Sequence, residues 1–172
     1  MKKQNKQQDK PDLHVVSFSG GKDSTAMLLK MLEEKMPVDM ILFCDTGLEF
    51  PALYEHIDKV EKDIGRKITR IKSEDDFEYL FAEKPIERKE NTLYAERYGM
   101  TRNGYGWAGP KMRWCTEVLK NQPRRKYLEE LKQDYNIIEY VGLAADEGYR
   151  LKRKCNSRGD CRHPLVDCGM TD

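Results

Sequence analysis

The chain lacks the features of membrane and secreted proteins. No apolar run approaches the ~18 residues that cross a bilayer, and the N-terminal segment MKKQNKQQDKPD has no apolar stretch of the signal-peptide type. The five cysteines are irregularly spaced and include no C-x-x-C pair. We therefore expect a cytoplasmic protein with reduced thiols and no membrane contact.

The sequence also lacks internal repeats, and its one biased segment is the Lys/Gln-rich start. Its 172 residues fit a single domain of the usual ~100–200 residues. A chain of this length buries roughly 70% of its unfolded surface, so a core needs no metal or disulfide. We interpret residues 1–12 as a mobile tail because they show no apolar periodicity, and residues 13–172 as the domain.

Charged residues are frequent, at 35% of the chain against the usual ~25%, yet the net charge is only +1. Their distribution is uneven, since residues 38–99 carry 10 basic and 15 acidic side chains whereas residues 100–172 carry 14 and 10. A basic C-terminal part on a nearly neutral chain predicts a local anion site rather than a protein that coats nucleic acid.

Short apolar runs alternate with helix-type periodicity along the chain. The pattern predicts strands at 14–18, 40–44, 67–71 and 137–141, helices at 23–36, 51–64 and 123–135, and a further helix that opens near Ser73 and Asp76, with 84–114 irregular. This alternation predicts an α/β fold, a three-layer doubly wound sandwich with a mainly parallel sheet. Such sheets bind ligands beyond the carboxyl ends of their strands, where the turns 19–23 and 45–47 both fall.

The segment Ser17–Thr25 has the composition of a phosphate-binding loop. The glycine pair at 20–21 lets the backbone approach an anion, the following helix start adds a partial positive charge, and Lys22 and two hydroxyl groups add donors. The lysine directly follows the glycines, so this is neither a Walker A loop nor a G-x-G-x-x-G loop. The structural alternative is a tight turn that Asp23 or Ser24 caps.

Several segments together resemble a known family. Residues 19–24, SGGKDS, match the SGGxDS motif of the PP-loop superfamily, the adenine-nucleotide alpha hydrolases. Residues 44–51, CDTGLEFP, resemble the D-T-G-x-x-F-P stretch of phosphoadenosine phosphosulfate (PAPS) reductases. Residues 142–150, GLAADEGYR, are similar to the G-I-R-x-D-E-x-x-R element of that family, and residues 163–166, HPLV, resemble its R/H-P-L segment. The resemblance runs from about residue 14 to the end of the chain.

This resemblance implies an adenine nucleotide, either ATP or an adenylyl sulfate such as PAPS or APS, that lies across the strand ends with Mg²⁺. The implied nucleotide-binding residues are Ser17, Ser19, Gly20, Gly21, Lys22, Asp23, Ser24 and Thr25 at the phosphates, and Asp45, Thr46 and Gly47 beside the adenosine. The implied catalytic residues are Lys22, Asp23, Cys115 and Arg150. Among these, Arg150 would face the phosphate or sulfate end.

The chain departs from the family pattern in two places. Ala144 stands where many relatives carry an arginine, which puts one anion contact in doubt. Relatives also continue past the equivalent of residues 169–172, where Thr171 would cap a further helix. We therefore expect a domain that is either truncated at its C-terminus or naturally minimal.

The cysteines leave alternatives open. Cys44 lies in an apolar strand and is interpreted as a core thiol. Cys115 lies between Arg113 and a possible helix start at Thr116, and both features depress a thiol pKa; the resemblance implies an iron–sulfur or substrate site there, with Lys120 as its basic residue. Four thiols could act together as the ligands of an iron–sulfur cluster: Cys115, Cys155, Cys161 and Cys168. The favoured interpretation is that these thiols are unrelated to one another.

Two basic runs, 124–126 and 150–162, bear on possible partners. A solvated surface is the usual explanation, but cations at 124–126 would lie in the first turn of the predicted helix, where the helix dipole disfavours them. That misplacement favours phosphate, sulfate or a nucleic-acid backbone as their partner. Three aromatic side chains of the glycine-rich stretch either stack on a base or line the core: Tyr105, Trp107 and Trp114.

Three functions are compatible with these observations. The first is an enzyme of the PAPS reductase family that cleaves ATP between the α and β phosphates, or transfers or reduces sulfur from an adenylyl sulfate with a thioredoxin-like reductant. The second is an ATP-dependent enzyme that thiolates or otherwise modifies tRNA or DNA. The third is a nucleotide-binding module without catalysis. Fold alone does not choose among them.

Overall fold

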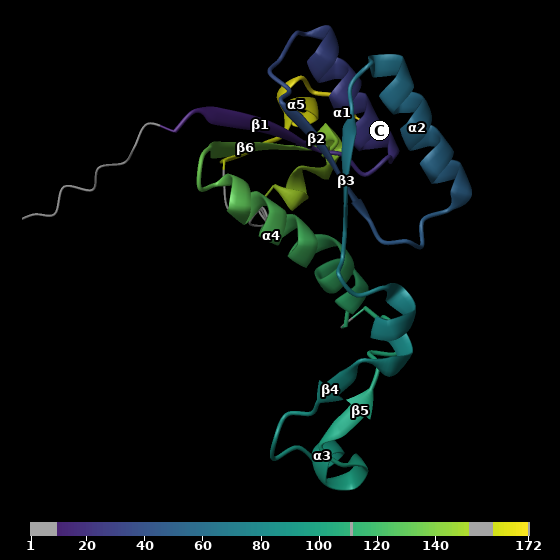
Figure 1. The fold of residues 1–172 in the computed structure, drawn as a ribbon. Helices are drawn as coiled ribbons and strands as arrows, with labels where there is room; N and C mark the ends of the chain where they lie inside the picture. Colours follow the sequence, from purple (N-terminus) through teal and green to yellow (C-terminus); the bar gives the residue numbers. More distant parts are fainter. Residues whose placement is uncertain (1–9, 111, 152–159, 172) are drawn as a thin grey trace, which may run out of the picture.

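A five-stranded parallel sheet forms the centre of the computed structural model, which describes residues 10–110, 112–151 and 160–171 (Figure 1). Its strands lie in the order β3-β2-β1-β6-β7, and every neighbouring pair is parallel. The strands are β1 (Asp12–Ser17), β2 (Met40–Asp45), β3 (Ile68–Lys72), β6 (Asn136–Val141) and β7 (Asp160–Arg162). The predicted parallel sheet is confirmed.

Helices cover both faces of this sheet. On one face lie α1 (Lys22–Glu33), α2 (Pro51–Ile64) and the short α5 (Pro164–Asp167), and on the other lies α4 (Gln122–Leu131) (Figure 1). The strands alternate accordingly, so that Val16 and Ile41 pack with α1 and α2 whereas Val15 and Leu42 pack with Leu128 of α4. The arrangement is the three-layer α/β sandwich that the sequence predicts.

Near both ends of the chain, residues that were not expected in strands belong to the sheet. β1 begins at Asp12, the last residue of the predicted tail, and the carbonyl of Pro11 accepts a hydrogen bond from the Asn136 N–H (2.9 Å). Residues 1–9 lie outside the described residues. The fifth strand, β7, falls within the basic run 150–162, for which no strand was expected.

The stretch 84–114, expected to be irregular, contains an arm that projects from the sheet (Figure 1). The arm comprises residues 84–110 and 112–114, and contains the antiparallel hairpin β4 (Pro85–Glu87) and β5 (Thr101–Asn103) with the helix α3 (Leu93–Tyr98) between the strands. A π-helix, η1 (Tyr79–Glu83), precedes the arm, and the Asp76 carboxylate accepts a hydrogen bond from the Tyr79 N–H (2.8 Å). The predicted helix opening near Asp76 is confirmed.

A separate apolar cluster anchors the arm. Trp114 is buried between Phe77 and Tyr105, with ring centroids 5.4 and 5.1 Å away. Gly104 has a φ of +65°, and a Cβ there would come within 2.0 Å of the Phe81 carbonyl oxygen, so this turn requires glycine. Trp114 and Tyr105 therefore line a core and are not available to stack on a base.

The helix that carries the basic run 124–126 begins earlier than predicted. A π-helix, η2 (Thr116–Asn121), continues directly into α4, so the expected start at Pro123 is wrong and the cations do not lie in a first turn. Instead, each cation faces a carboxylate: Arg124 with Glu139, Arg125 with Glu117, and Lys126 with Glu74. The argument from misplaced charge at these residues therefore fails.

Candidate functional site

The two glycines of the loop between β1 and α1 have different roles. Gly20 has a φ of +73°, and a Cβ there would lie 2.7 Å from Cδ1 of Leu53 on α2, so this position packs against the protein. A Cβ on Gly21 would meet nothing closer than the Ser19 hydroxyl at 3.4 Å. The backbone at Gly21 is therefore open, and a ligand can approach it directly.

Hydrogen bonds of Ser24 hold this loop in place. Its buried hydroxyl donates to the Gly21 carbonyl (3.0 Å), accepts from the Ser19 N–H (3.2 Å) and lies 3.0 Å from the Ser19 hydroxyl. The hydroxyl of Thr25 lies 3.2 Å from Nε2 of His56 on α2. Since both predicted hydroxyl donors have partners inside the protein, the groups that face outward are those of the helix start.

The first turn of α1 supplies these outward-facing groups. The N–H groups at Lys22 and Asp23 precede the first intrahelical hydrogen bond, which runs from the Thr25 N–H to the Gly21 carbonyl (3.0 Å). The side chain of Lys22 is exposed at the same end of the helix. Together these groups form a positive, donor-rich end suited to an anion.

Gly142, directly after β6, contributes to the loop although it was not predicted as a site residue and entered only as the first position of the segment 142–150. A Cβ on Gly142 would lie 2.8 Å from the Ser24 nitrogen and 2.9 Å from the Asp23 carbonyl carbon. The end of β6 therefore packs backbone against backbone on the first turn of α1. A lone glycine after a buried strand was the signal available in the sequence.

The second predicted turn, 45–47, is built around the buried carboxylate of Asp45. This carboxylate accepts hydrogen bonds from the Gly47 N–H (2.8 Å) and the Tyr54 hydroxyl (2.7 Å), and pairs with Lys72 (3.0 Å). Burial acts to raise the pKa of Asp45, but these three partners outweigh it and hold the pKa below its usual range. Asp45 thus orders the turn next to the loop, with Thr46 and Gly47 more exposed than Asp45.

A pocket of about 180 Å³ opens beside the loop on the α4 face of the sheet. Its walls include Ser17 and Ser19 from the loop, Cys44 from the end of β2, and the cations Lys120 and Arg124. Burial raises the pKa of Cys44, against the opposing effect of the two cations. Cys44, expected to be a core thiol, thus lies half-buried in the wall of this pocket.

The cations of this pocket have acidic partners. Lys120 pairs with Glu49 (3.1 Å), which lies beyond the 45–47 turn, and so links η2 to that turn. Arg124 pairs with Glu139 of β6 at 2.5 Å, and their side chains are only 14% and 1% exposed. Both cations of the pocket wall are therefore already paired with a carboxylate.

The other two predicted catalytic residues lie near this edge of the sheet without entering the pocket wall. Cys115 immediately precedes η2 and packs into the apolar cluster of Trp114 at the base of the arm. Arg150 ends η3 (Ala145–Arg150), which follows β6, and its guanidinium is 2.5 Å from Glu147. The structure thus brings the two predicted turns together and leaves Cys115 and Arg150 at their margin.

The thiols do not assemble into a metal site in the part of the chain that the structure describes. Within those ranges no three His, Cys, Asp or Glu side chains gather closely enough to hold a metal ion. Cys44, Cys115 and Cys168 are free thiols, and Cys155 lies outside the described residues. Cys161 is disulfide-bonded, which corrects the expectation that all five thiols are reduced.

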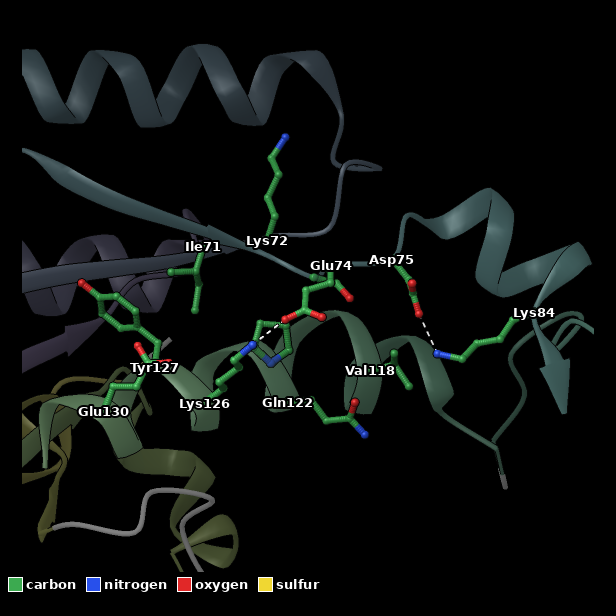
Figure 2. A pocket seen from close by; sticks show the side chains of 12 residues that line it. Ile71, Lys72, Glu74, Asp75, Lys84, Val118, Gln122, Lys126, Tyr127 and Glu130 are labelled. Carbon is green, nitrogen blue, oxygen red and sulfur yellow. Dashed lines mark hydrogen bonds and ion pairs between the residues drawn. The ribbon is translucent and has the colours of Figure 1, made fainter. Parts of the chain in front are cut away.

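A larger hollow, about 590 Å³, lies between the end of β3 and α4 rather than at the loop (Figure 2). Two ion pairs flank it, Lys126 with Glu74 and Lys84 with Asp75, the latter at 2.6 Å (Figure 2). Its lining mixes cations with carboxylates and includes Gln122 and Pro123 at the start of α4. The cations of the smaller pocket are paired as well, so its position beside Ser19 of the loop, and neither its volume nor its charge, makes it the candidate anion site.

Comparison with known proteins identifies the family to which the chain belongs. The family model of the phosphoadenosine phosphosulfate reductase domain matches residues 13–148. These residues run from β1 into η3 and include the turns 19–23 and 45–47. The chain belongs to the PAPS reductase family. Its membership in this PP-loop family supports a nucleotide-utilising function at the level of the family and suggests an enzyme.

Two relatives of this PAPS reductase family member have names that state no activity. The uncharacterized protein MJ0066 of Methanocaldococcus jannaschii is 30% identical over 140 residues, which are 81% of this chain and 24% of that protein. The uncharacterized nin region protein ORF290 of Escherichia phage lambda is 30% identical over 152 residues, 83% of this chain and 51% of that protein. The chain thus spans about a quarter to a half of the length of these relatives. In the described ranges, no helix combines the length and apolarity needed to cross a membrane.

Proposed function

We propose that this protein binds an adenine nucleotide through the loop 19–25 and is an enzyme that acts at the phosphate or sulfate end of that nucleotide. The observation that carries the proposal is the open backbone at Gly21, which leads into the donor-rich first turn of α1 in a member of the PAPS reductase family. In this proposal the 45–47 turn lies beside the adenosine, and Mg²⁺ accompanies the phosphates.

Of the reactions compatible with the family, cleavage of ATP between the α and β phosphates fits the site best. An acceptor atom forms a bond to the α phosphorus while the bond to the bridging oxygen breaks, and pyrophosphate leaves with the electron pair. The N–H groups of the first turn and Lys22 stabilise the charge that develops on the phosphate oxygens. Asp23, Cys115 and Arg150 remain proposed catalytic residues, and Arg150 would have to exchange Glu147 for the nucleotide.

Reductive removal of sulfur fits less well because it requires a reactive thiolate. Cys44 is the thiol in the pocket wall, and burial raises its pKa, which keeps it protonated at neutral pH. Cys115 packs among apolar side chains at the base of the arm. Neither environment favours attack on the sulfur of an adenylyl sulfate, and such an attack would fall to the exposed free thiol of Cys168.

The substitution Gly21→Val tests nucleotide binding. We expect it to abolish ATP binding, measured by calorimetry, because the new side chain occupies the space that the phosphates require. The domain should stay folded, since a Cβ at Gly21 has open space around it. Gly109→Val is the matched control, because Gly109 also has open space but lies on the arm. ATP affinity that is unchanged in Gly21→Val would refute the proposed site.

Product analysis tests the reaction. The protein is incubated with ATP or with an adenylyl sulfate, with and without thioredoxin, while AMP, pyrophosphate and sulfite are followed. We expect pyrophosphate from ATP, either alone or only when RNA or DNA is added as acceptor. Sulfite that depends on thioredoxin would overturn the choice of ATP cleavage. If the protein binds a nucleotide but forms none of these products, it is a nucleotide-binding module without catalysis.

A further inference from the structure

The arm exposes aromatic rings that a folded domain ordinarily buries. The side chains of Tyr94, Tyr98 and Trp107 are 71%, 56% and 81% exposed. Tyr94 and Tyr98 lie one turn apart on α3 with ring centroids 5.9 Å from each other, and Trp107 lies against Phe81 at the base of the arm (4.9 Å). These exposed rings offer flat surfaces to which planar groups can stack.

The same arm carries an excess of positive charge. Residues 84–114 contain seven basic and three acidic side chains. The guanidinium of Arg97 lies over the Tyr98 ring at 5.5 Å, and that of Arg102 lies 4.0 Å from the sulfur of Met112. Neither arginine pairs with a carboxylate of the described residues, in contrast to the three cations at 124–126 of α4.

The arm joins the sheet at the edge that holds the candidate nucleotide site. The chain leaves β3 at its carboxyl end, passes through the arm, and returns in η2, where Thr116 and Lys120 line the pocket beside the loop. Figure 1 shows the arm projecting from this side of the molecule. A polymer held along the arm would therefore be directed toward the nucleotide.

We propose that the arm binds single-stranded nucleic acid, with bases stacked on Tyr94, Tyr98 and Trp107 and phosphates bound by Arg97 and Arg102. Rings interleaved with cations that have no acidic partner in the described structure match the chemistry of a flexible polyanion with exposed bases. A duplex would satisfy the cations but keep its bases from the rings. This binding is separate from the loop 19–25, although a bound strand would be the acceptor that the proposed reaction needs.

Fluorescence anisotropy with the full chain and a labelled 20-nucleotide oligo(dT) or oligo(U) tests the proposal. We expect Trp107→Ala and the double change Tyr94→Ala/Tyr98→Ala each to weaken binding at least about fivefold, the lower range for one stacked base. Tyr149→Ala is the matched control, since Tyr149 is 63% exposed in η3 outside the arm, and should leave binding unchanged. Circular dichroism verifies that each variant is folded.

The salt dependence of binding distinguishes phosphate contacts by the arginines from stacking on the aromatic rings. Replacing Arg97 and Arg102 by Gln should lower the slope of log affinity against log salt by about 1.4, or ~0.7 for each phosphate that is no longer neutralised. Lys59→Gln on α2 is the control for removal of a surface charge. An unlabelled duplex of the same length should compete less well than the single strand, and equal competition would overturn the stacking proposal.

Two further results would overturn the proposal. One is the absence of oligonucleotide binding by the parent protein. The other is a dimer in solution that Trp107→Ala dissociates without any effect on oligonucleotides, which would make the arm a surface between copies of the chain. Failure of the nucleotide site is distinguishable, because arm variants should keep ATP affinity and Gly21→Val should keep oligonucleotide affinity.

Discussion

Arg124 and Glu139 form a buried ion pair whose disruption should strongly destabilise the protein. Glu139 lies on β6 in the middle of the sheet with its side chain 1% exposed, and the guanidinium of Arg124 on α4 lies 2.5 Å from the carboxylate. The Nε of Arg124 is buried without a hydrogen-bond partner in the described structure. Each charge is therefore stabilised mainly by the other, because water has little access to either side chain.

The expected magnitude follows from this burial. Arg124→Met leaves the Glu139 carboxylate buried without its cation, and removal of one partner of such a pair costs about 3–5 kcal/mol. This is a large part of a total stability of about 5–15 kcal/mol. Arg124→Met combined with Glu139→Leu removes both charges, so the double variant should be more stable than the single one.

Urea unfolding followed by circular dichroism, without nucleotide, measures these differences. Lys126→Met is the matched control, because Lys126 lies on the same helix and its pair with Glu74 is exposed. That control should leave the free energy of unfolding nearly unchanged, since water and salt screen an exposed pair. An effect of Arg124→Met no larger than that of the control, or a double variant less stable than the single one, would refute this reasoning.

Three other changes test the site and the arm. Asp45→Asn should destabilise the protein at neutral pH, and because the folded-state pKa of Asp45 is depressed, the difference from the parent should shrink as pH falls below about 4 in urea titrations. Gly142→Ala should weaken ATP binding in calorimetry, since its Cβ would press on Ser24. Gly104→Ala should increase protease cleavage within the arm, because its Cβ would overlap the Phe81 carbonyl while the sheet stays folded.

The sequence alone was sufficient to predict four of the five strands of the central sheet and the loop between β1 and α1. Short apolar runs separated by helix-type periodicity identify buried parallel strands, since each residue in such a strand is covered on one face or the other. The pair Gly20 and Gly21 predicts a backbone that an anion can approach, and the structure adds that Gly20 packs on Leu53 while Gly21 remains open. These are properties of neighbouring residues, so local patterns carry them.

Tertiary structure decided what the charges and the glycine-rich stretch do. The run 124–126 could not be interpreted without its partners Glu139, Glu117 and Glu74, which come from β6, η2 and the segment after β3. Likewise, composition did not reveal that Trp114 is buried and Trp107 exposed, because that depends on how the arm packs against η1. Local sequence fixes backbone preference and hydrophobic periodicity, whereas the partner of a charge or a ring is set by segments that only folding brings together.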